Sequence, residues 1–233
     1  MSNTQEKTNI QSGIVLEKQQ ISEHTFHIKV QSAEFALMKY IAGFTTNIFL
    51  GNPYYEKDCE YRKYSFWNYD PIYQVADFAI CTFSQGKGAG WIQTLQQGDT
   101  IYFQSPRGKL LIDNSEIQYL LIGDITSLSH LYEIYRNLSV SKNVFSFIYA
   151  QQQADIFPDL DQSYPFDYHI INPILSDEIL NSIIKIVPDR VENTIAYIFG
   201  HPETCIKVHN YLKTERNISI QNLRTKPFWK TDK

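Results

Sequence analysis

The sequence has little of what marks several classes of protein. Its three cysteines, Cys59, Cys81 and Cys205, are far apart and form no CxxC pair, which argues against a disulfide framework or a zinc ribbon. The six histidines show no metal-ligand spacing, so we expect no metal site made by the protein. A net charge of −4 offers no basic excess for a nucleic acid. No apolar run approaches the roughly 20 residues that a membrane span needs, so we expect no membrane segment.

The N-terminal segment MSNTQEKTNIQSG is polar and lacks the apolar stretch of a secretory signal. We therefore expect a cytoplasmic protein, a monomer by default, with a disordered N-terminus over residues 1–12. A chain of 233 residues with 43% apolar residues is long enough for one large domain or two small ones. Aromatic residues reach 14%, which suits a β-rich fold or a stacking site.

The first half of the chain, residues 13–112, has the pattern of an antiparallel β-domain. Short runs rich in Ile, Val, Thr, Phe and Tyr are separated by turn sequences such as GNP, YDP and QQGD. Strands without long helices between them predict a closed barrel or a sandwich. One short helix is expected in GWIQTLQQG, beginning near Trp91 and ending at Gly98. The expected strands are residues 13–22, 25–32, 45–51, 63–69, 75–84 and 99–106.

The second half, residues 116–233, alternates apolar strands with amphipathic helices, which predicts βαβ units and a parallel sheet. The expected fold is thus an antiparallel β-barrel followed by a small parallel α/β domain. Strands are expected at residues 117–123, 143–150, 167–172, 193–200 and 218–226, and helices at 124–139, 176–187 and 201–215.

The stretch YRKYS, residues 61–65, is the first candidate site. Arg62 and Tyr64 are two residues apart, so on a strand both side chains point to one face. Such a face offers a cation and an aromatic ring to one ligand, and Ser65 faces the other way unless the strand bends. The alternative is a barrel strand with an exposed Arg–Tyr pair.

The glycine-rich stretch SQGKGAGW follows about twenty residues later. Glycines let the backbone approach a phosphate, and the N-terminus of the expected helix adds free N–H donors. Lys87 adds a positive charge. The alternative interpretation is an ordinary glycine-rich hairpin turn, because a single such loop is a weak signal.

Two expected strands of the α/β half end in glycine, at Gly123 and Gly200. Ligands of parallel sheets bind at the carboxyl ends of strands, so these two ends predict a crevice. We place Thr126 and Ser127 in the first turn of the helix that follows Gly123, and Asp124 would otherwise serve as its N-cap. The full GxGxxG fingerprint is absent, which excludes an ordinary Rossmann site.

The order of RKYS, GKGAGW with QQGDTIYFQSPRGKL, GDITSL and a closing PFWK resembles that of the siderophore-interacting proteins. These are FAD-dependent ferric-siderophore reductases within the ferredoxin–NADP reductase superfamily. The similarity covers nearly the whole chain, and RxYS is its most informative motif. The resemblance implies a flavin-binding barrel and an α/β domain that binds NAD(P)H.

The resemblance assigns roles to individual positions. Tyr64 and Ser65 would be the catalytic contacts to the isoalloxazine ring, and Phe228 belongs with Trp229 to a C-terminal aromatic element near the cofactor. Nicotinamide-nucleotide contacts would be Gly123, Thr126, Gly200 and His201. The FAD-binding residues would be Arg62, Tyr64, Ser65, Phe83, Gly86, Lys87, Gly88, Ala89, Gly90, Trp91, Asp124, Thr126, Ser127 and Trp229.

Several positions depart from the family pattern. Trp67 stands where a second arginine is common, and Ser84-Gln85 stands where a histidine is usual. The phosphate loop lacks the Pro and Ser of GxGPAS, and Ser129 lies where a proline is common. These departures concern the FAD site and the choice of electron donor more than the fold.

The resemblance implies a flavin-dependent oxidoreductase that reduces ferric siderophores and releases Fe(II), with electrons from NAD(P)H or a ferredoxin through FAD. The rivals are a general NAD(P)H–flavin reductase or diaphorase and a non-catalytic electron-transfer or regulatory subunit of the same fold. Ferric siderophores are often anionic, so a rim of basic residues around the site is expected. The candidates for this rim are Lys63, Arg224, Lys226 and Lys230. The alternative is that they are ordinary solvated charges.

Overall fold

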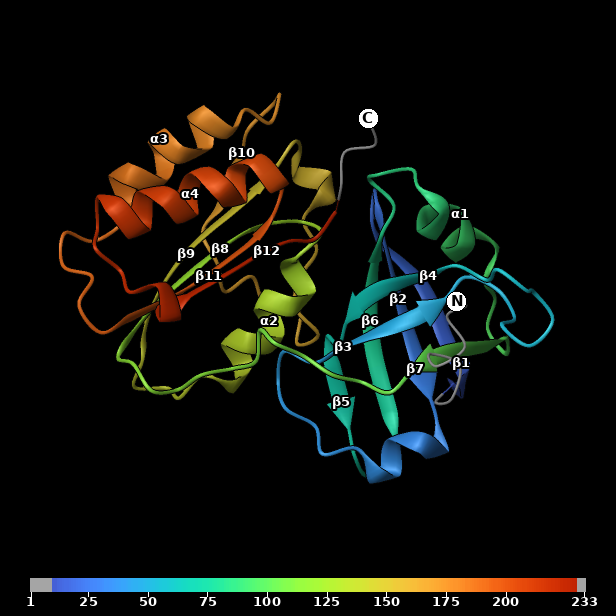
Figure 1. Cartoon of the computed structure of the whole chain (residues 1–233). Helices are drawn as coiled ribbons and strands as arrows, with labels where there is room; N and C mark the ends of the chain where they lie inside the picture. The colour runs from blue at the N-terminus through green and yellow to red at the C-terminus, as the bar shows by residue number, and fades with distance from the viewer. Residues whose placement is uncertain (1–9, 230–233) are drawn as a thin grey trace, which may run out of the picture. The chain divides into compact units, whose positions relative to one another are not determined.

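The computed structural model of the chain describes residues 10–229 (Figure 1). The chain forms two compact units, and the division between them falls between Leu111 and Ile112. Our prediction of a disordered segment over residues 1–12 is wrong for its last three residues. Ile10 and Ser12 pair with Gln104 and Tyr102 in an antiparallel ladder, which fixes this part of the backbone. Residues 1–9 lie outside the described part of the chain.

The first unit is a seven-stranded antiparallel sheet with strand order β4-β3-β7-β1-β2-β6-β5. Alternating apolar residues from most of these strands point inward, because successive side chains of a strand face opposite sides. They bury a core that includes Val15, Ile28, Ile48, Phe78 and Phe103. The strands are β1 (Ile10–Ser22), β2 (Thr25–Gln31), β3 (Thr45–Phe49), β4 (Tyr61–Ser65), β5 (Asn68–Asp70), β6 (Val75–Cys81) and β7 (Thr100–Gln104), with a 3-10 helix, η2 (Ala33–Leu37), after β2.

The two edge strands of this sheet, β4 and β5, are consecutive in sequence. We expected one strand over residues 63–69, and this prediction is wrong at Phe66 and Trp67. The Phe66 N–H donates to the Phe44 carbonyl, and the Trp67 N–H donates to the Asp77 carbonyl. The backbone therefore leaves β3 and joins β6 at this point, which curls the sheet toward a barrel.

The helix of the first unit also differs from expectation. Helix α1 spans Lys87–Thr94, so it begins four residues before Trp91 and ends before Gly98. Gly88 and Gly90, which we placed in a loop, lie within the helix. Gly98 instead has a positive φ of 91° in the turn that leads to β7.

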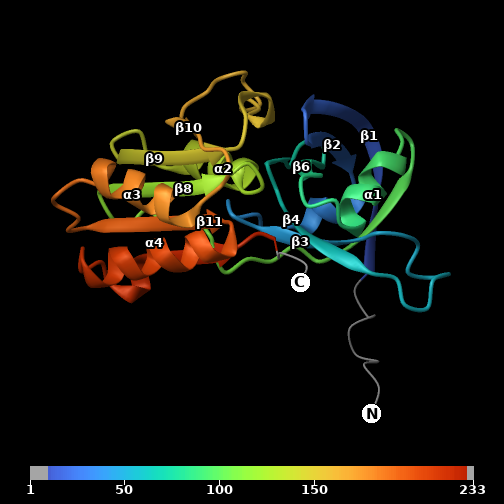
Figure 2. The same cartoon turned by 90° about the horizontal axis from the view of Figure 1, so that it is seen from above.

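The second unit is a five-stranded parallel sheet with strand order β10-β9-β8-β11-β12. Helices α3 and α4 cover one face of this sheet and α2 lies on the other, as Figures 1 and 2 show. An antiparallel β-unit followed by a parallel α/β unit is the fold class that the sequence predicted. The elements are β8 (Gln118–Asp124), α2 (Leu128–Asn137), β9 (Asn143–Ala150), η3 (Gln153–Asp155), β10 (Tyr168–Ile170), α3 (Ser176–Ile186), β11 (Thr194–Gly200), α4 (Pro202–Thr214), η4 (Ile220–Asn222) and β12 (Leu223–Pro227).

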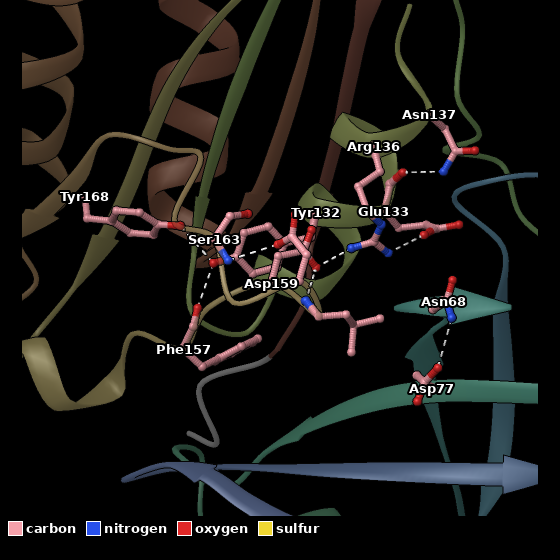
Figure 3. A network of polar contacts seen from close by, with 12 residues as sticks. Asn68, Asp77, Tyr132, Glu133, Arg136, Asn137, Phe157, Asp159, Ser163 and Tyr168 are labelled. Atoms are coloured by element: carbon pink, nitrogen blue, oxygen red, sulfur yellow. Dashed lines mark hydrogen bonds and ion pairs between the residues drawn. The ribbon is translucent and has the colours of Figure 1, made fainter.

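A buried polar network ties α2 to the long connection between β9 and β10 (Figure 3). The Arg136 guanidinium lies between Glu133, at 2.6 Å, and Asp159. The Tyr132 hydroxyl donates to the Phe157 carbonyl at 2.7 Å. This connection is therefore held by polar bonds as well as by packing. Among the described helices, none combines the length and hydropathy of a membrane span.

Candidate functional site

Strand β4 carries Arg62 and Tyr64 on one face, and α1 lies against that face. The close approach depends on Gly88: a Cβ atom there would lie 2.5 Å from the Tyr64 hydroxyl and 3.5 Å from Arg62 Cγ. Alternation along the strand thus puts both side chains beside the first turn of α1, as the spacing of the two residues predicts. A side chain at position 88 would force Tyr64 to move.

Tyr64 also stacks on Trp91, one turn further along α1, with ring centroids 6.2 Å apart and planes 24° apart. Both rings pack against the barrel core while remaining half-buried. Burial raises the pKa of the Tyr64 hydroxyl, and the nearby Arg62 charge only partly opposes this. Tyr64 therefore stays a neutral phenol, suited to stacking and to donating a hydrogen bond.

The two cations of this face, Arg62 and Lys87, share one carboxylate. Arg62 Nη2 lies 3.2 Å from Glu60 Oε2, and Lys87 Nζ contacts Glu60 Oε1. The hydrogen bond from Lys87 is the main reason why the pKa of Glu60 is lowered. Our sequence reasoning did not include Glu60. The sequence feature that could have identified Glu60 is its place two positions before Arg62, which puts both side chains on the same side of an extended chain.

These residues fit the diphosphate part of a flavin dinucleotide. Arg62 and Lys87 converge on one anion, so their charges already lie within reach of a common acceptor. Gly86 is the N-cap of α1 and has no side chain that could occupy the first N–H groups of the helix. The first N–H groups of a helix have no partner within it, so α1 adds donors beside the two cations.

Other predicted FAD residues of this unit lie differently. Ser65 is buried at the end of β4, opposite Thr45 of β3. Ala89 is buried in α1, while the Phe83 ring packs edge-on against His24, with centroids 5.7 Å apart. Arg62, Tyr64, Lys87, Gly88 and Trp91 form one cluster, joined through Glu60 and through the contacts of Tyr64 with α1.

Trp67, which stands where the siderophore-interacting proteins often have a second arginine, is buried. Its side chain is 2% exposed and packs edge-on against His27, with ring centroids 5.2 Å apart. His27 Nε2 lies 2.7 Å from Asp77 Oδ1, and Asn68 donates to the other oxygen of Asp77. The polar groups at this place in the barrel are therefore paired with one another beneath the indole.

In the second unit, the turn after β8 is built around Asp124. Strand β8 continues through Asp124 and α2 begins at Leu128, so Thr126 and Ser127 lie in the turn and not in the first helical turn. The Asp124 carboxylate accepts the Thr126 N–H at 3.0 Å and its hydroxyl at 2.5 Å. Gly123 lets α2 pack closely, because a Cβ there would collide with Ser127 Oγ.

The predicted strand ends meet at Asp124. The Trp229 indole donates to Asp124 Oδ2 at 3.1 Å, and the His201 ring packs edge-on against Trp229 at 5.1 Å. Gly200 has a φ of 110°, and a Cβ there would lie 2.5 Å from the Asp124 carboxylate. Burial raises the pKa of Asp124, although bonds from Thr126 and Trp229 act in the opposite direction.

One residue that we missed belongs to the same edge of the sheet. The Tyr149 hydroxyl, at the end of β9, accepts the His201 N–H at 3.4 Å. Burial, together with the nearby Asp124, raises the pKa of this hydroxyl well above its usual value. Its signal was an aromatic residue with a polar tip at the carboxyl end of an apolar strand.

The predicted basic rim is only partly described. Arg224 donates to Asp113 at 2.9 Å, which commits its charge to a bond within the second unit. Lys226 Nζ lies 5.6 Å from the centroid of the Phe228 ring. Lys63 is exposed on β4, and Lys230 lies outside the described residues.

Comparison with solved structures finds close likeness of fold along almost the whole chain. The siderophore-interacting protein SipS from Aeromonas hydrophila superposes with a TM-score of 0.81 at 14% identity, over 95% of this chain and 91% of that one. A siderophore utilization protein from T. fusca gives 0.80 at 15% identity, over 94% and 92%. A ferredoxin–NADP+ reductase from Plasmodium falciparum gives 0.73 at 18% identity, over 94% and 96%.

No protein-family model matches the sequence, and no curated protein matches it. Identities of 14–18% show a shared fold and not a shared activity. The fold is that of ferredoxin reductase-like proteins, siderophore-interacting proteins among them, as the order of the sequence motifs predicts.

Proposed function

We propose that this protein is a flavin-dependent oxidoreductase that reduces ferric siderophores and releases Fe(II). FAD would bind on the antiparallel unit, and NAD(P)H or a ferredoxin would supply electrons. The proposal extends to a cytoplasmic setting, where such donors are reduced. The observation that carries it is the cluster around α1, in which a strand cation, a strand tyrosine and a helix lysine converge.

The protein's part in this chemistry is binding and exclusion of water. Arg62, Lys87 and the N-terminus of α1 would hold the diphosphate by charge and by N–H donors. Tyr64 would support the ring system from the face of β4, backed by Trp91. Ser65, at the end of the same strand, would donate a hydrogen bond to the edge of the ring. When bound, FAD supplies the conversion between a two-electron donor and one-electron acceptors.

In the α/β unit, the carboxyl ends of β8 and β11 would receive the nicotinamide nucleotide. Gly123 and Gly200 make room at this edge for Ser127 and for the Asp124 carboxylate, and Thr126 and His201 would offer polar groups. Trp229 lies over Asp124 at the same edge. Because the aromatic C-terminal segment contacts this edge, we infer that it shields the site from solvent.

The overall reaction balances at two ferric ions per nicotinamide nucleotide. NAD(P)H loses two electrons and one proton, and each Fe(III) siderophore gains one electron. Hard oxygen ligands hold Fe(II) far more weakly than Fe(III), so the reduced iron leaves. The iron is cargo that arrives already chelated, so the chain needs no ligand of its own for it.

The decisive experiment is a flavin spectrum followed by turnover. Purified protein incubated with FAD should become yellow, lose its colour when NADPH, NADH or reduced ferredoxin is added without oxygen, and recover it with a ferric siderophore. An Arg62→Ala/Tyr64→Ala double variant should fail to retain FAD while keeping its far-UV circular dichroism. A colourless wild-type protein, or stoichiometric FAD in the double variant, would refute this site.

A general NAD(P)H–flavin reductase is the second candidate, and the position of Glu60 favours it. A carboxylate between the two cations would compete with a diphosphate and weaken its binding. Weak binding suits a reductase whose bound flavin exchanges with free flavin. Turnover with free flavin as the acceptor, compared with turnover on ferric siderophores, separates the two activities. Equal rates with quinones, free flavin and siderophores would support the second candidate.

A further inference from the structure

The carboxylate of Glu60 stands at the place where the proposed function requires a phosphate. Its two oxygens are divided between two cations, with Oε2 beside the Arg62 guanidinium and Oε1 beside the Lys87 ammonium. The chain itself thus supplies an anion to both donors. A ligand phosphate that uses the same two donors has to displace this carboxylate.

The three side chains are solvated, so the displacement is feasible. The exposed fraction is 42% for Glu60, 46% for Arg62 and 70% for Lys87. Exposed ion pairs contribute little to the stability of a protein and exchange partners readily. Arg62 Nη1 also donates to the Tyr61 carbonyl at 2.9 Å, which leaves the guanidinium anchored when its carboxylate leaves.

We propose that Glu60 is an internal competitor of the phosphate-bearing ligand and that it sets the affinity for FAD. The proposal rests on the proposed function for the identity of the ligand, but its chemistry concerns any diphosphate. In the free protein, Glu60 pairs with both cations and cancels one of their two positive charges. In the bound protein, it swings away and the diphosphate takes both. Affinity is then weaker than the same site would give without this carboxylate.

The opposite role makes the opposite prediction. If Glu60 merely positioned Arg62 and Lys87 for the ligand, its removal would disorder both side chains and weaken binding. A competitor and a positioning residue are therefore distinguished by the sign of one measured change. No other outcome is needed to choose between them.

The test is the substitution Glu60→Gln, which removes the charge and preserves the size of the side chain. Glu34→Gln is the matched control, because Glu34 is an exposed glutamate of the same unit, on η2. Titrations of the full chain would use three probes: FAD, inorganic pyrophosphate and riboflavin, which carries no phosphate. We expect Glu60→Gln to tighten FAD and pyrophosphate by roughly three- to tenfold, and riboflavin binding to stay unchanged.

Salt gives a second readout. The gain in affinity of Glu60→Gln should shrink at about 0.5 M NaCl, where exposed charges act on one another over only a few ångströms. Glu34→Gln should match the wild type with every probe. Where the wild type binds FAD, an unchanged or weaker FAD affinity of Glu60→Gln would overturn the proposal, and so would an unchanged or weaker affinity for pyrophosphate.

The two proposals fail in different ways. If neither form binds FAD but Glu60→Gln still tightens pyrophosphate, the flavin function is wrong and the competitor role stands. If the wild type binds FAD and Glu60→Gln binds it equally well, the flavin function stands and the competitor role is wrong. If neither probe gains affinity in the variant, Glu60 is not a competitor.

Discussion

Two arginine–carboxylate networks in this chain use the same chemistry in opposite surroundings. In the α/β unit, Arg136 lies between Glu133 and Asp159, whose side chains are 4% and 2% exposed (Figure 3). In the antiparallel unit, Glu60 lies between Arg62 and Lys87, and all three are well exposed. One network has two anions around a cation, and the other has two cations around an anion.

The difference in burial determines what each network can do. Removing one partner from a buried network leaves charge in a medium that solvates it poorly, so the structure depends on the full set. Removing one partner from an exposed network leaves charge in water, so the set can open for a ligand. The buried network therefore fastens α2 to the β9–β10 connection, whereas the exposed one is available for binding.

The largest expected effect is on stability, from Arg136→Met. The substitution keeps much of the apolar stem but leaves two buried carboxylates without their arginine. We expect the free energy of unfolding to fall by about 3 kcal/mol, as is usual when one partner of a buried ion pair is removed. Urea unfolding followed by circular dichroism measures it. Arg190→Met, at an exposed arginine of the same unit, should stay within about 0.5 kcal/mol of the wild type.

The same substitution in the other network, Arg62→Met, should have a different effect. We expect the urea midpoint to match that of the wild type, because the Glu60 and Lys87 charges remain in water. Affinity for FAD should fall at least tenfold, or about 1.4 kcal/mol, because a charge-assisted bond to phosphate is lost. Flavin fluorescence titration measures this loss. A marked drop in stability would show that the exposed network is structural and would break the comparison.

The fold was predictable because hydrophobic period changes near residue 112, from two to about 3.6. The errors occurred where distant backbone contacts decide the local structure. The expected strand is interrupted at Phe66 and Trp67 because their N–H groups donate to the carbonyls of Phe44 and Asp77. No local sequence pattern shows these two bonds. Helix α1 begins early, at Lys87, and includes Gly88, which leaves room for the Tyr64 hydroxyl despite the poor helix propensity of glycine.

The candidate site was predictable to the extent that it depends on alternation and on strand ends. The spacing of Arg62 and Tyr64 placed both on the face that contacts α1. The pairing of Glu60 with Lys87 joins residues 27 positions apart, so only the tertiary structure reveals it. The bond from Trp229 to Asp124 spans 105 positions, and sequence alone supplied it only through a family resemblance.

Two glycines of α1 sharpen the comparison from the side of the binding site. Gly90 is exposed with nothing near its missing Cβ, so Gly90→Ala should raise the free energy of unfolding by about 0.5–1 kcal/mol through helix propensity. Gly88→Ala has the same intrinsic gain, but its methyl group meets the Tyr64 hydroxyl. We expect that gain to be lost and Tyr64 to shift.

The displaced tyrosine gives a separate readout. Gly88→Ala should weaken FAD binding severalfold, whereas Gly90→Ala should leave it unchanged, and both are measured by flavin fluorescence beside urea unfolding. Equal gains in stability with equal FAD affinities for the two variants would show that Tyr64 does not need its place against α1. In that case the exposed network would bind phosphate independently of the ring contact.

The smallest expected effect concerns Asp124, a buried carboxylate whose described hydrogen bonds come from a hydroxyl, an amide and an indole instead of a cation. Its pKa is raised in the folded protein, chiefly by burial. The carboxyl of the unfolded chain loses its proton near a pH of about 3.9. Between that pH and the higher folded pKa, the folded state keeps a proton that the unfolded state has lost. The contribution of this group to the free energy of unfolding is fully present below that pH and is lost as pH rises through the folded pKa.

Asp124→Asn removes this titration and keeps an oxygen that can accept the Thr126 N–H. The difference in unfolding free energy between variant and wild type should shift in favour of the variant as pH rises from about 4 toward neutrality. Urea unfolding at pH 4, 5, 6 and 7 measures the slope for both proteins. Parallel slopes would mean that Asp124 is ionised in the folded state. The hydrogen bonds from Thr126 and Trp229 would then stabilise a buried carboxylate as well as Arg136 stabilises Glu133 and Asp159. Burial alone would then not decide whether a carboxylate needs a cation as its partner.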